Sequence, residues 1–367
     1  MVRSGTGWPM MANGAKTQPR TLPTHGALEL PSVQVDTYNC ELEDEDGFVG
    51  DKASRVAFRN ILNRVRKALR TSGEDPLGKR HSEEISKKKL DVLLAEGEPE
   101  AAAVIQSAIE DFAQQLASVV KRFLRIKAWR GTKCIVLGGG LRASRGGELS
   151  IARAAILLKE GDVNVDLRPI HHDPDEAGLI GAAHLLPAWM LDGHDGILAA
   201  DVGGSNIRAG IVDLNLERER DLSKACVPEM KLWRHKDHKV DRDETVARLT
   251  HMLGSLIKSA KKRDLNLAPV LGIACPGVIE EDGSITRGAQ NLPGNWQSSK
   301  FNLPAAIREE LPRIGHHEIL VVMHNDAVVQ GLSELPHLKD YERWGVLTLG
   351  TGLGNARFSR KATTSKR

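Results

Sequence analysis

Two segments of the chain share one order, an apolar strand, a glycine-rich turn and a second strand. In the first, apolar runs at 197–202 and 207–214 enclose the turn Gly203, Gly204, Ser205 and Asn206. In the second, runs at 345–349 and 355–359 enclose Gly350, Thr351 and Gly352. Glycines let a backbone approach a phosphate closely, with free N–H groups turned toward its oxygens. Either segment alone could be an ordinary hairpin. Two of them, each opening half of a duplicated fold, predict a pincer that grips the phosphates of one nucleotide.

The segments around these turns alternate between helical and strand-like patterns. After the first turn we expect a strand at Met230–Trp233 that starts beyond Pro228, a helix at Asp243–Ala260, and strands at Val270–Cys275 and Glu318–Met323. Three antiparallel strands followed by alternating helix and strand are typical of the ribonuclease-H-like plan. Before the first turn, the patterns predict helices at 51–71, 89–95, 100–125, 148–159 and Asp175–Trp189, and strands at Leu28–Val35, Cys134–Leu137 and Val163–Leu167.

Composition narrows the class of protein. The 367 residues are enough for two domains, and 41% are hydrophobic and 27% charged, as in a soluble globular protein. The net charge of +3 is small, and Lys and Arg are spread along the chain, so a nucleic-acid partner is not expected. No apolar stretch approaches 18 residues, which argues against a membrane partner. Four separated cysteines and the absence of a signal-like N-terminus predict a cytoplasmic protein with free thiols.

Two aspartates stand at strand ends beside the predicted turns. Asp201 ends the strand before the first turn, where it could hold Mg²⁺ directly or through water, and Arg208 closes the same motif. Asp326 follows Asn325 at the end of another strand. A carboxylate there could accept the proton of an attacking hydroxyl, and the neighbouring Asn could orient a sugar. The alternative is that Asp326 caps the helix 327–332.

Two further loops could complete a nucleotide and sugar site. The strand Cys134–Leu137 runs into Gly138, Gly139 and Gly140, where an adenosine could lie against bare backbone. The loops after Val270–Cys275 are rich in Gly, Pro and Asn, and their candidate substrate contacts are Pro276, Gly277, Asn291 and Asn295. Loops of this composition also occur without a binding role.

Taken together, these five segments resemble the bacterial glucokinases and the ROK sugar kinases over roughly 300 residues. The resemblance implies an α/β protein with two ribonuclease-H-like, actin-like ATPase domains and an interdomain cleft. Asp201–Arg208 and Gly350–Gly354 resemble the two phosphate motifs, and Gly138–Gly140 the adenosine motif. Asn325 and Asp326 resemble the sugar-binding and catalytic pair.

The order of the motifs differs from that family. There the first phosphate motif opens the chain and the adenosine motif lies near its end, whereas here Gly138–Gly140 precedes Asp201. A circular permutation is therefore predicted. The larger domain would comprise residues 1–175 and 343–367, with the adenosine and second phosphate motifs. The smaller domain would comprise residues 176–342.

The predicted sugar side departs from the family in three places. His25 matches the His of the family's Glu-x-x-His element, but Leu22 stands at the Glu position. Gly50 stands where a second carboxylate is expected, and Cys40 is alone where other members have a zinc-binding cluster. These departures leave the sugar undetermined.

The resemblance implies an enzyme that uses ATP and Mg²⁺ to phosphorylate a hexose hydroxyl, with glucose as the default sugar. Its partners would be ATP and a small sugar, and a homodimer is an open option. A sugar-sensing or regulatory protein of the same fold with weak or no kinase activity is the alternative. A more distant alternative is an actin-like ATPase, against which Asn325, Asp326 and the loop 288–296 argue.

Overall fold

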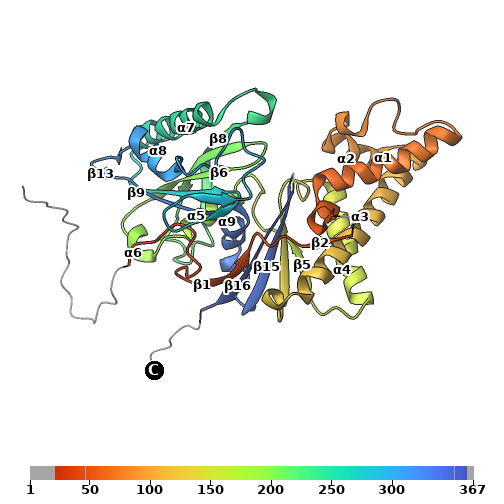
Figure 1. The fold of residues 1–367 in the computed structure, drawn as a ribbon, viewed down its shortest axis with the longest axis horizontal. Coiled ribbons are helices and arrows are strands. Elements are labelled where there is room, and N and C mark those ends of the chain that lie inside the picture. Colours follow the sequence, from red (N-terminus) through yellow and green to blue (C-terminus); the bar gives the residue numbers. More distant parts are fainter. Residues whose placement is uncertain (1–20, 46, 351, 362–367) are drawn as a thin grey trace, which may run out of the picture.

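Two five-stranded sheets form the framework of the protein (Figure 1). A computed structural model describes residues 21–45, 47–350 and 352–361, and the part of the fold around each sheet is called a lobe. Lobe A contains β1 (Val33–Tyr38), β16 (Leu353–Arg360), β15 (Arg343–Leu349), β4 (Cys134–Gly138) and β5 (Asp166–Pro169), in that order across the sheet. Lobe B contains β14 (Leu320–Asn325), β9 (Leu267–Cys275), β6 (Gly196–Val202), β7 (Ile207–Asp213) and β8 (Cys226–Trp233).

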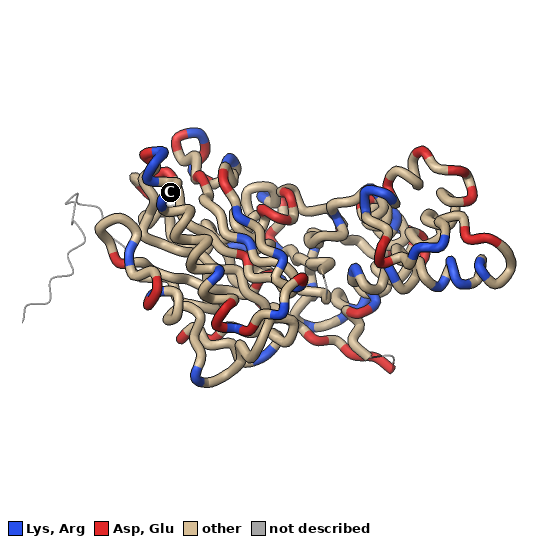
Figure 2. The backbone as a smooth tube through the Cα atoms, turned by 90° about the horizontal axis from the view of Figure 1, so that it is seen from above, with Lys and Arg blue, Asp and Glu red and all other residues tan. Residues whose placement is uncertain are grey.

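Helices pack against both sheets. Lobe A has α1 (Arg55–Ser72), α2 (Lys87–Glu96), α3 (Pro99–Arg125) and α4 (Arg145–Glu160), of which α1 and α2 pack mainly on α3 and lie farther from the sheet. Lobe B has α7 (Arg242–Lys262) and α8 (Leu303–Glu310). The short strand pairs are β2 (Glu43–Asp44) with β3 (Gly47–Phe48), β10 (Val278–Ile279) with β11 (Ile285–Arg287), and β12 (Arg313–Ile314) with β13 (His317–Glu318). Acidic and basic residues are interspersed over both lobes (Figure 2). No helix in the described ranges is long and apolar enough to cross a membrane.

Both sheets follow the same plan. In lobe B, β6, β7 and β8 form an antiparallel meander, and β9 and β14 then add in parallel on the other side of β6. In lobe A, β15, β16 and β1 form the equivalent meander, and β4 and β5 add in parallel beside β15. The predicted α/β class with two ribonuclease-H-like lobes is therefore confirmed.

The chain order differs between the lobes. The meander of lobe B is continuous, whereas that of lobe A takes its first two strands from the end of the chain and its third from near the start. Val33 of β1 lies opposite Arg360 of β16, and the Lys361 N–H donates to the Ser32 carbonyl at 3.3 Å. The circular permutation and the domain bounds at 175 and 342 stay predictions, and both termini lie outside the described residues.

The third strand of lobe B begins earlier than expected. It runs from Cys226 and includes Pro228, which was predicted to precede it. The ladder between β7 and β8 is irregular between Ile211 and Asp213, opposite this proline. Because β8 is an edge strand with a bulge at this point, no partner requires the N–H that Pro228 lacks.

The predicted helix Asp175–Trp189 is two shorter helices. α5 spans Ala177–Ala183 and α6 spans Ala188–Leu191, with Pro187 just before the second. A proline cannot continue the hydrogen bonding of α5, so the helix ends ahead of it. The strand predicted at Glu318–Met323 is also shifted: it begins at Leu320, since 317–318 pair instead with 313–314, and it extends to Asn325.

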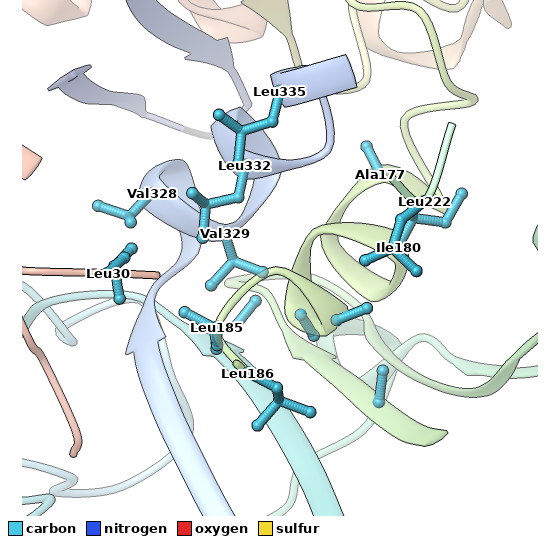
Figure 3. Close-up of a cluster of buried hydrophobic side chains, with 14 of the residues drawn as sticks. Leu30, Ala177, Ile180, Leu185, Leu186, Leu222, Val328, Val329, Leu332 and Leu335 are labelled. Atoms are coloured by element: carbon cyan, nitrogen blue, oxygen red, sulfur yellow. The ribbon is translucent and has the colours of Figure 1, made fainter. Parts of the chain in front are cut away.

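The two connections between the lobes pack against each other. α5 leads from lobe A to β6, and α9 (Asp326–Leu332) leads from β14 back toward β15. Apolar side chains of both helices and their flanking turns form one buried cluster (Figure 3). Gly181 makes the contact close, because a Cβ there would lie 1.8 Å from the Val329 carbonyl oxygen.

Histidines gather beside this helix contact. His171 and His172 follow β5, and His337 follows α9; the rings of His171 and His337 stack with centroids 3.9 Å apart. Burial, reinforced by the charge of His171, lowers the pKa of His172 to about 4. Burial also lowers the pKa of His184, which follows α5, to about 4. His172 and His184 are therefore neutral at pH 7.

Acid should destabilise this junction. A histidine whose folded pKa lies below its unfolded value of about 6.5 gives stability that is complete above that pH and is lost as the pH falls toward about 4. Each such group should reduce the free energy of unfolding by about 1–2 kcal/mol between pH 7 and pH 5. Denaturant titration of wild type and His172→Asn at both pH values should show a smaller loss in the variant. Equal losses would contradict the prediction.

The permutation is tested by relinking the chain. Arg367 would be joined to Met1 through a short linker, and the chain would be opened at the exposed Gly193, between α6 and β6. The variant should fold, because every strand keeps its neighbours. Circular dichroism and thermal unfolding would check this. Cooperative folding of residues 1–175 as an isolated monomer would contradict the permutation, since that fragment lacks β15 and β16.

Candidate active site

A cavity of about 490 Å³ lies between the lobes and is lined by both glycine-rich turns. The predicted site residues that line it are Gly139, Gly140, Asp201, Gly203, Gly204, Ser205, Asn206, Arg208, Pro276, Gly277, Asn291, Asp326, Gly350 and Gly352. These residues lie up to 213 positions apart in the sequence (352 − 139), and the packing of the two lobes brings them together.

Four predicted residues do not line the cavity, and Thr351 lies outside the described residues. Gly138 is the last residue of β4. His25 accepts a hydrogen bond from the Met323 N–H at 3.1 Å, and Asn295 accepts one from the Gln297 N–H at 3.0 Å. His25 thus holds the backbone of β14, and Asn295 holds the backbone of its own loop.

Asn325 is the fourth, and its amide stabilises the start of α9. Its Oδ1 accepts from the N–H groups of Ala327 and Val328, and its Nδ2 donates to the Gly277 carbonyl at 2.9 Å. The cap of this helix is therefore Asn325, whereas Asp326 is the first helical residue. This position leaves the Asp326 carboxylate facing the cavity while Asn325 is buried beneath it.

Asp201 and Arg208 face each other across the first turn. The pairing of β6 with β7 places them opposite, with Arg208 Nη1 3.0 Å from Asp201 Oδ2. Arg208 also pairs with Asp175, at the start of the segment that leads into α5. Burial raises the pKa of Asp201, while the Arg208 charge opposes that shift. The arginine thus keeps a buried carboxylate close to where a phosphate group would lie.

The donor set fits a magnesium ion held mainly by a nucleotide. The described residues contain no cluster of three or more acidic, His or Cys ligands. Mg²⁺ usually keeps several waters and binds through one or two carboxylates plus phosphate oxygens. One carboxylate oxygen of Asp201 accepts a hydrogen bond from Arg208. The other oxygen could bind the magnesium ion directly or through water.

Asp326 has the environment of a proton acceptor. It follows β14, is half-buried, and accepts a hydrogen bond from the Ala327 N–H at 2.9 Å. Burial, together with the nearby charge of Asp201, raises its pKa to about 6. The carboxylate is therefore ionised at pH 7 and is a stronger base than an exposed aspartate.

The turn after β4 and the second glycine-rich turn touch each other in lobe A. Gly139 has φ +83°, and a Cβ there would lie 2.7 Å from the backbone of Leu349. The Leu141 N–H donates to the Leu349 carbonyl, and the Arg55 N–H donates to the Gly350 carbonyl at 3.1 Å. In lobe B, a Cβ added to Gly204 would lie 2.9 Å from the Asn291 Cβ, so the first turn touches the loop that contains Asn291.

Sequence reasoning missed the wall that follows β1. Asn39, Cys40 and Glu41 line the cavity, as do Gln290 and Asn355. These residues carry no glycine pattern, and the approach of Asn39, Cys40 and Glu41 to the site depends on β1 pairing with β16. Polar residues directly after a strand were the available signal.

Comparison with known proteins gives similarity to solved structures. No protein-family model matches the chain, and no curated protein matches it. The chain is similar to a Listeria monocytogenes protein provisionally assigned as an N-acetylmannosamine kinase, with 24% identity and a TM-score of 0.33. The match covers 47% of this chain and 51% of that chain. It is also similar to a provisionally assigned sugar kinase from Cytophaga hutchinsonii, with 22% identity and a TM-score of 0.33. That match covers 44% of this chain and 47% of that chain. A third similar structure is the ROK hexokinase from Thermus thermophilus, with 21% identity and a TM-score of 0.32. This match covers 44% of this chain and 45% of that chain. The chain spans about half the length of these proteins.

Adjacent glycines provide a matched test of the contact between the two turns of lobe A. Gly139→Ala should reduce the free energy of unfolding by more than about 2 kcal/mol, because its φ is positive and its Cβ would meet the Leu349 backbone. Gly140→Ala should change it by less than about 1 kcal/mol, since the nearest atom to its Cβ is Lys87 Nζ at 4.0 Å. Denaturant unfolding measures both, and equal effects would contradict the described contact.

Proposed function

We propose that this protein is an ATP-dependent sugar kinase that transfers the γ-phosphoryl group to a hexose hydroxyl. The observation that carries this proposal is the convergence of both glycine-rich turns and Asp326 on one cavity between the lobes. The resemblance to glucokinases favours glucose as the sugar and its 6-hydroxyl as the nucleophile. The sugar-sensing alternative draws on one feature, that His25, Asn295 and Asn325 do not line the cavity.

The described groups divide the work of phosphoryl transfer. The Gly203 N–H donates to the Asn206 carbonyl, and the Gly350 N–H donates to the carbonyls of Thr348 and Gly352. Other backbone N–H groups of the two turns, such as those of Gly204 and Gly352, would therefore hold the phosphates of ATP, and Gly139 and Gly140 would border its adenosine. Mg²⁺, when bound beside Asp201, would neutralise charge on the phosphates. Catalysis in such a site is mostly positioning and charge stabilisation.

Asp326 would take the proton of the attacking hydroxyl. Its carboxylate shares the cavity with Asp201 and Asn291, so an acceptor between them would face the phosphate turns. As the hydroxyl oxygen bonds to the γ-phosphorus, the bond from phosphorus to the bridging oxygen of ADP breaks and the proton passes to Asp326. The raised pKa, about 6, brings the proton affinity of this group close to the working pH.

Replacement of Asp326 tests the proposal after an acceptor has been found by screening ATP, Mg²⁺ and a panel of sugars. Asp326→Asn should lower kcat by roughly 10²–10⁴-fold and leave ATP affinity nearly unchanged. In the wild type, kcat/KM should fall below about pH 6, because the protonated carboxyl group cannot accept the proton. The variant should lose this acid limb.

Asp51→Asn is the matched control, since Asp51 is an exposed carboxylate that lines the same cavity. It should change kcat by no more than a few-fold. A variant Asp326→Asn that keeps more than about a tenth of wild-type turnover would exclude Asp326 as the base. A folded wild type that binds ATP but phosphorylates none of the sugars would contradict the kinase function.

A further inference from the structure

The loop after β1 forms a cavity wall that no predicted motif covers. Asn39, Cys40 and Glu41 all line the cavity. Asn39 has φ +49°, a left-handed conformation that is uncommon for a residue with a side chain and that Asn tolerates better than most. Non-glycine residues in this region often occur where a side chain must be held in one place.

Hydrogen bonds from both lobes fix this loop. The Asn39 N–H donates to the Asn355 carbonyl at 2.9 Å. The buried side chain of Asn355 then accepts from the Cys40 N–H at 2.9 Å and donates to the Cys40 carbonyl at 3.0 Å. From lobe B, the Ile279 backbone N–H and carbonyl both lie 3.3 Å from the Tyr38 hydroxyl. The wall is therefore preorganised and does not need to order when a ligand binds.

The Asn39 side chain carries a hydrogen-bond donor without a partner. Its Nδ2 atom is buried and makes no hydrogen bond within the described part of the chain. A Cβ added to Gly288 would lie 3.0 Å from this nitrogen and 2.9 Å from the Cα of Gly277, so the amide lies beside the two glycines that flank the pair β10 and β11. Since buried donors are nearly always paired, a bound molecule is a natural partner for this one.

The charges around this part of the cavity select the kind of molecule. Its lining side chains are the amides Asn39, Gln290 and Asn291 and the carboxylates Glu41 and Asp326. Arg287, on β11, is 3.9 Å from Glu41 and does not line the cavity. The lining arginines, Arg55 and Arg208, lie at the phosphate turns instead. An acceptor with its own carboxylate or phosphate would meet Asp326, for which no ion pair is described, and Glu41, whose cation Arg287 is 3.9 Å away and does not line the cavity.

We propose that Asn39 and Glu41 hold the sugar acceptor in place and determine its specificity. The Asn39 amide donates to one acceptor hydroxyl oxygen, and the Glu41 carboxylate accepts from another hydroxyl. This inference rests on the proposed kinase function. In it, Asn39 and Glu41 take over the contacts of the two carboxylates that the resemblance would place at positions 22 and 50, where this chain has Leu22 and Gly50. Asn39 and Glu41 position the acceptor, whereas Asp326 remains the base.

Two substitutions at Asn39 separate its donor from its backbone role. Asn39→Gly suits the positive φ and removes the side chain, so the fold should remain as stable as the wild type. Asn39→Asp keeps the shape but removes the donor. Both should raise KM for the neutral sugar roughly 5–100-fold and change KM for ATP less than about twofold. Asn215→Gly, at an asparagine with a similar positive φ (+48°) outside the cavity, is the matched control and should leave both KM values unchanged.

Acceptor chemistry provides an independent readout. For the wild type, kcat/KM for a neutral hexose should exceed that for the matching hexuronic acid and hexose phosphate by at least about 100-fold. Glu41→Gln should narrow this difference, because it removes one of the two repelling charges. Unchanged KM for sugar in both Asn39 variants, or equal use of neutral and anionic acceptors, would overturn the inference.

Direct binding distinguishes failure of this inference from failure of the kinase proposal. If the wild type phosphorylates nothing, calorimetric titration with the same neutral hexose still applies. Weaker binding by Asn39→Gly than by the wild type would then support the acceptor wall in a non-catalytic sugar-binding protein. No sugar binding by the wild type would overturn both proposals.

Discussion

The close contact between α5 and α9 sets the geometry on which the site depends. These two helices carry the chain from one lobe to the other. Gly181 lets their backbones approach so closely that a side-chain Cβ at this position would collide with the Val329 carbonyl. On its other side, α9 packs on the sheet of lobe A, where a Cβ at Gly331 would lie 2.8 Å from the Phe358 ring. Each helix also begins next to a site residue, Asp175 before α5 and Asp326 at the start of α9. The same contact therefore fixes the spacing between the lobes and the positions of two carboxylates.

Electrostatics divides the carboxylates of the cavity into different roles. Asp201 has a fixed cation, Arg208, and Asp326 has only a backbone N–H donor among the contacts that the structure describes. Ionising two nearby carboxylates in a buried site costs free energy because their charges repel. The carboxylate without a neighbouring cation therefore binds its proton more tightly. Asp201 is therefore suited to remain ionised beside Arg208, and Asp326 is suited to gain and lose a proton.

Much of the fold was predictable because apolar periodicity and glycine-rich turns are local signals. The strands around Gly203–Asn206 and Gly350–Gly352 were expected nearly where they lie, and the long helix α3 begins within one residue of its predicted start. The errors have non-local causes: Pro228 is tolerated because its strand is at an edge, and 317–318 pair within a short hairpin. Asn39 and Glu41 could not be placed, because their position depends on a pairing between residues about 320 positions apart, such as Val35 with Phe358.

The order of strands in lobe A has a consequence for synthesis. β4 and β5 leave the ribosome long before β15, the strand against which β4 pairs in the finished sheet. Lobe B, by contrast, emerges as one uninterrupted run from β6 to β14 and can complete its sheet while the chain is still growing. The part of the protein made first is then the last to finish folding. During that interval the apolar faces of α3 and β4 depend on cellular chaperones, or on transient non-native packing, for protection from aggregation.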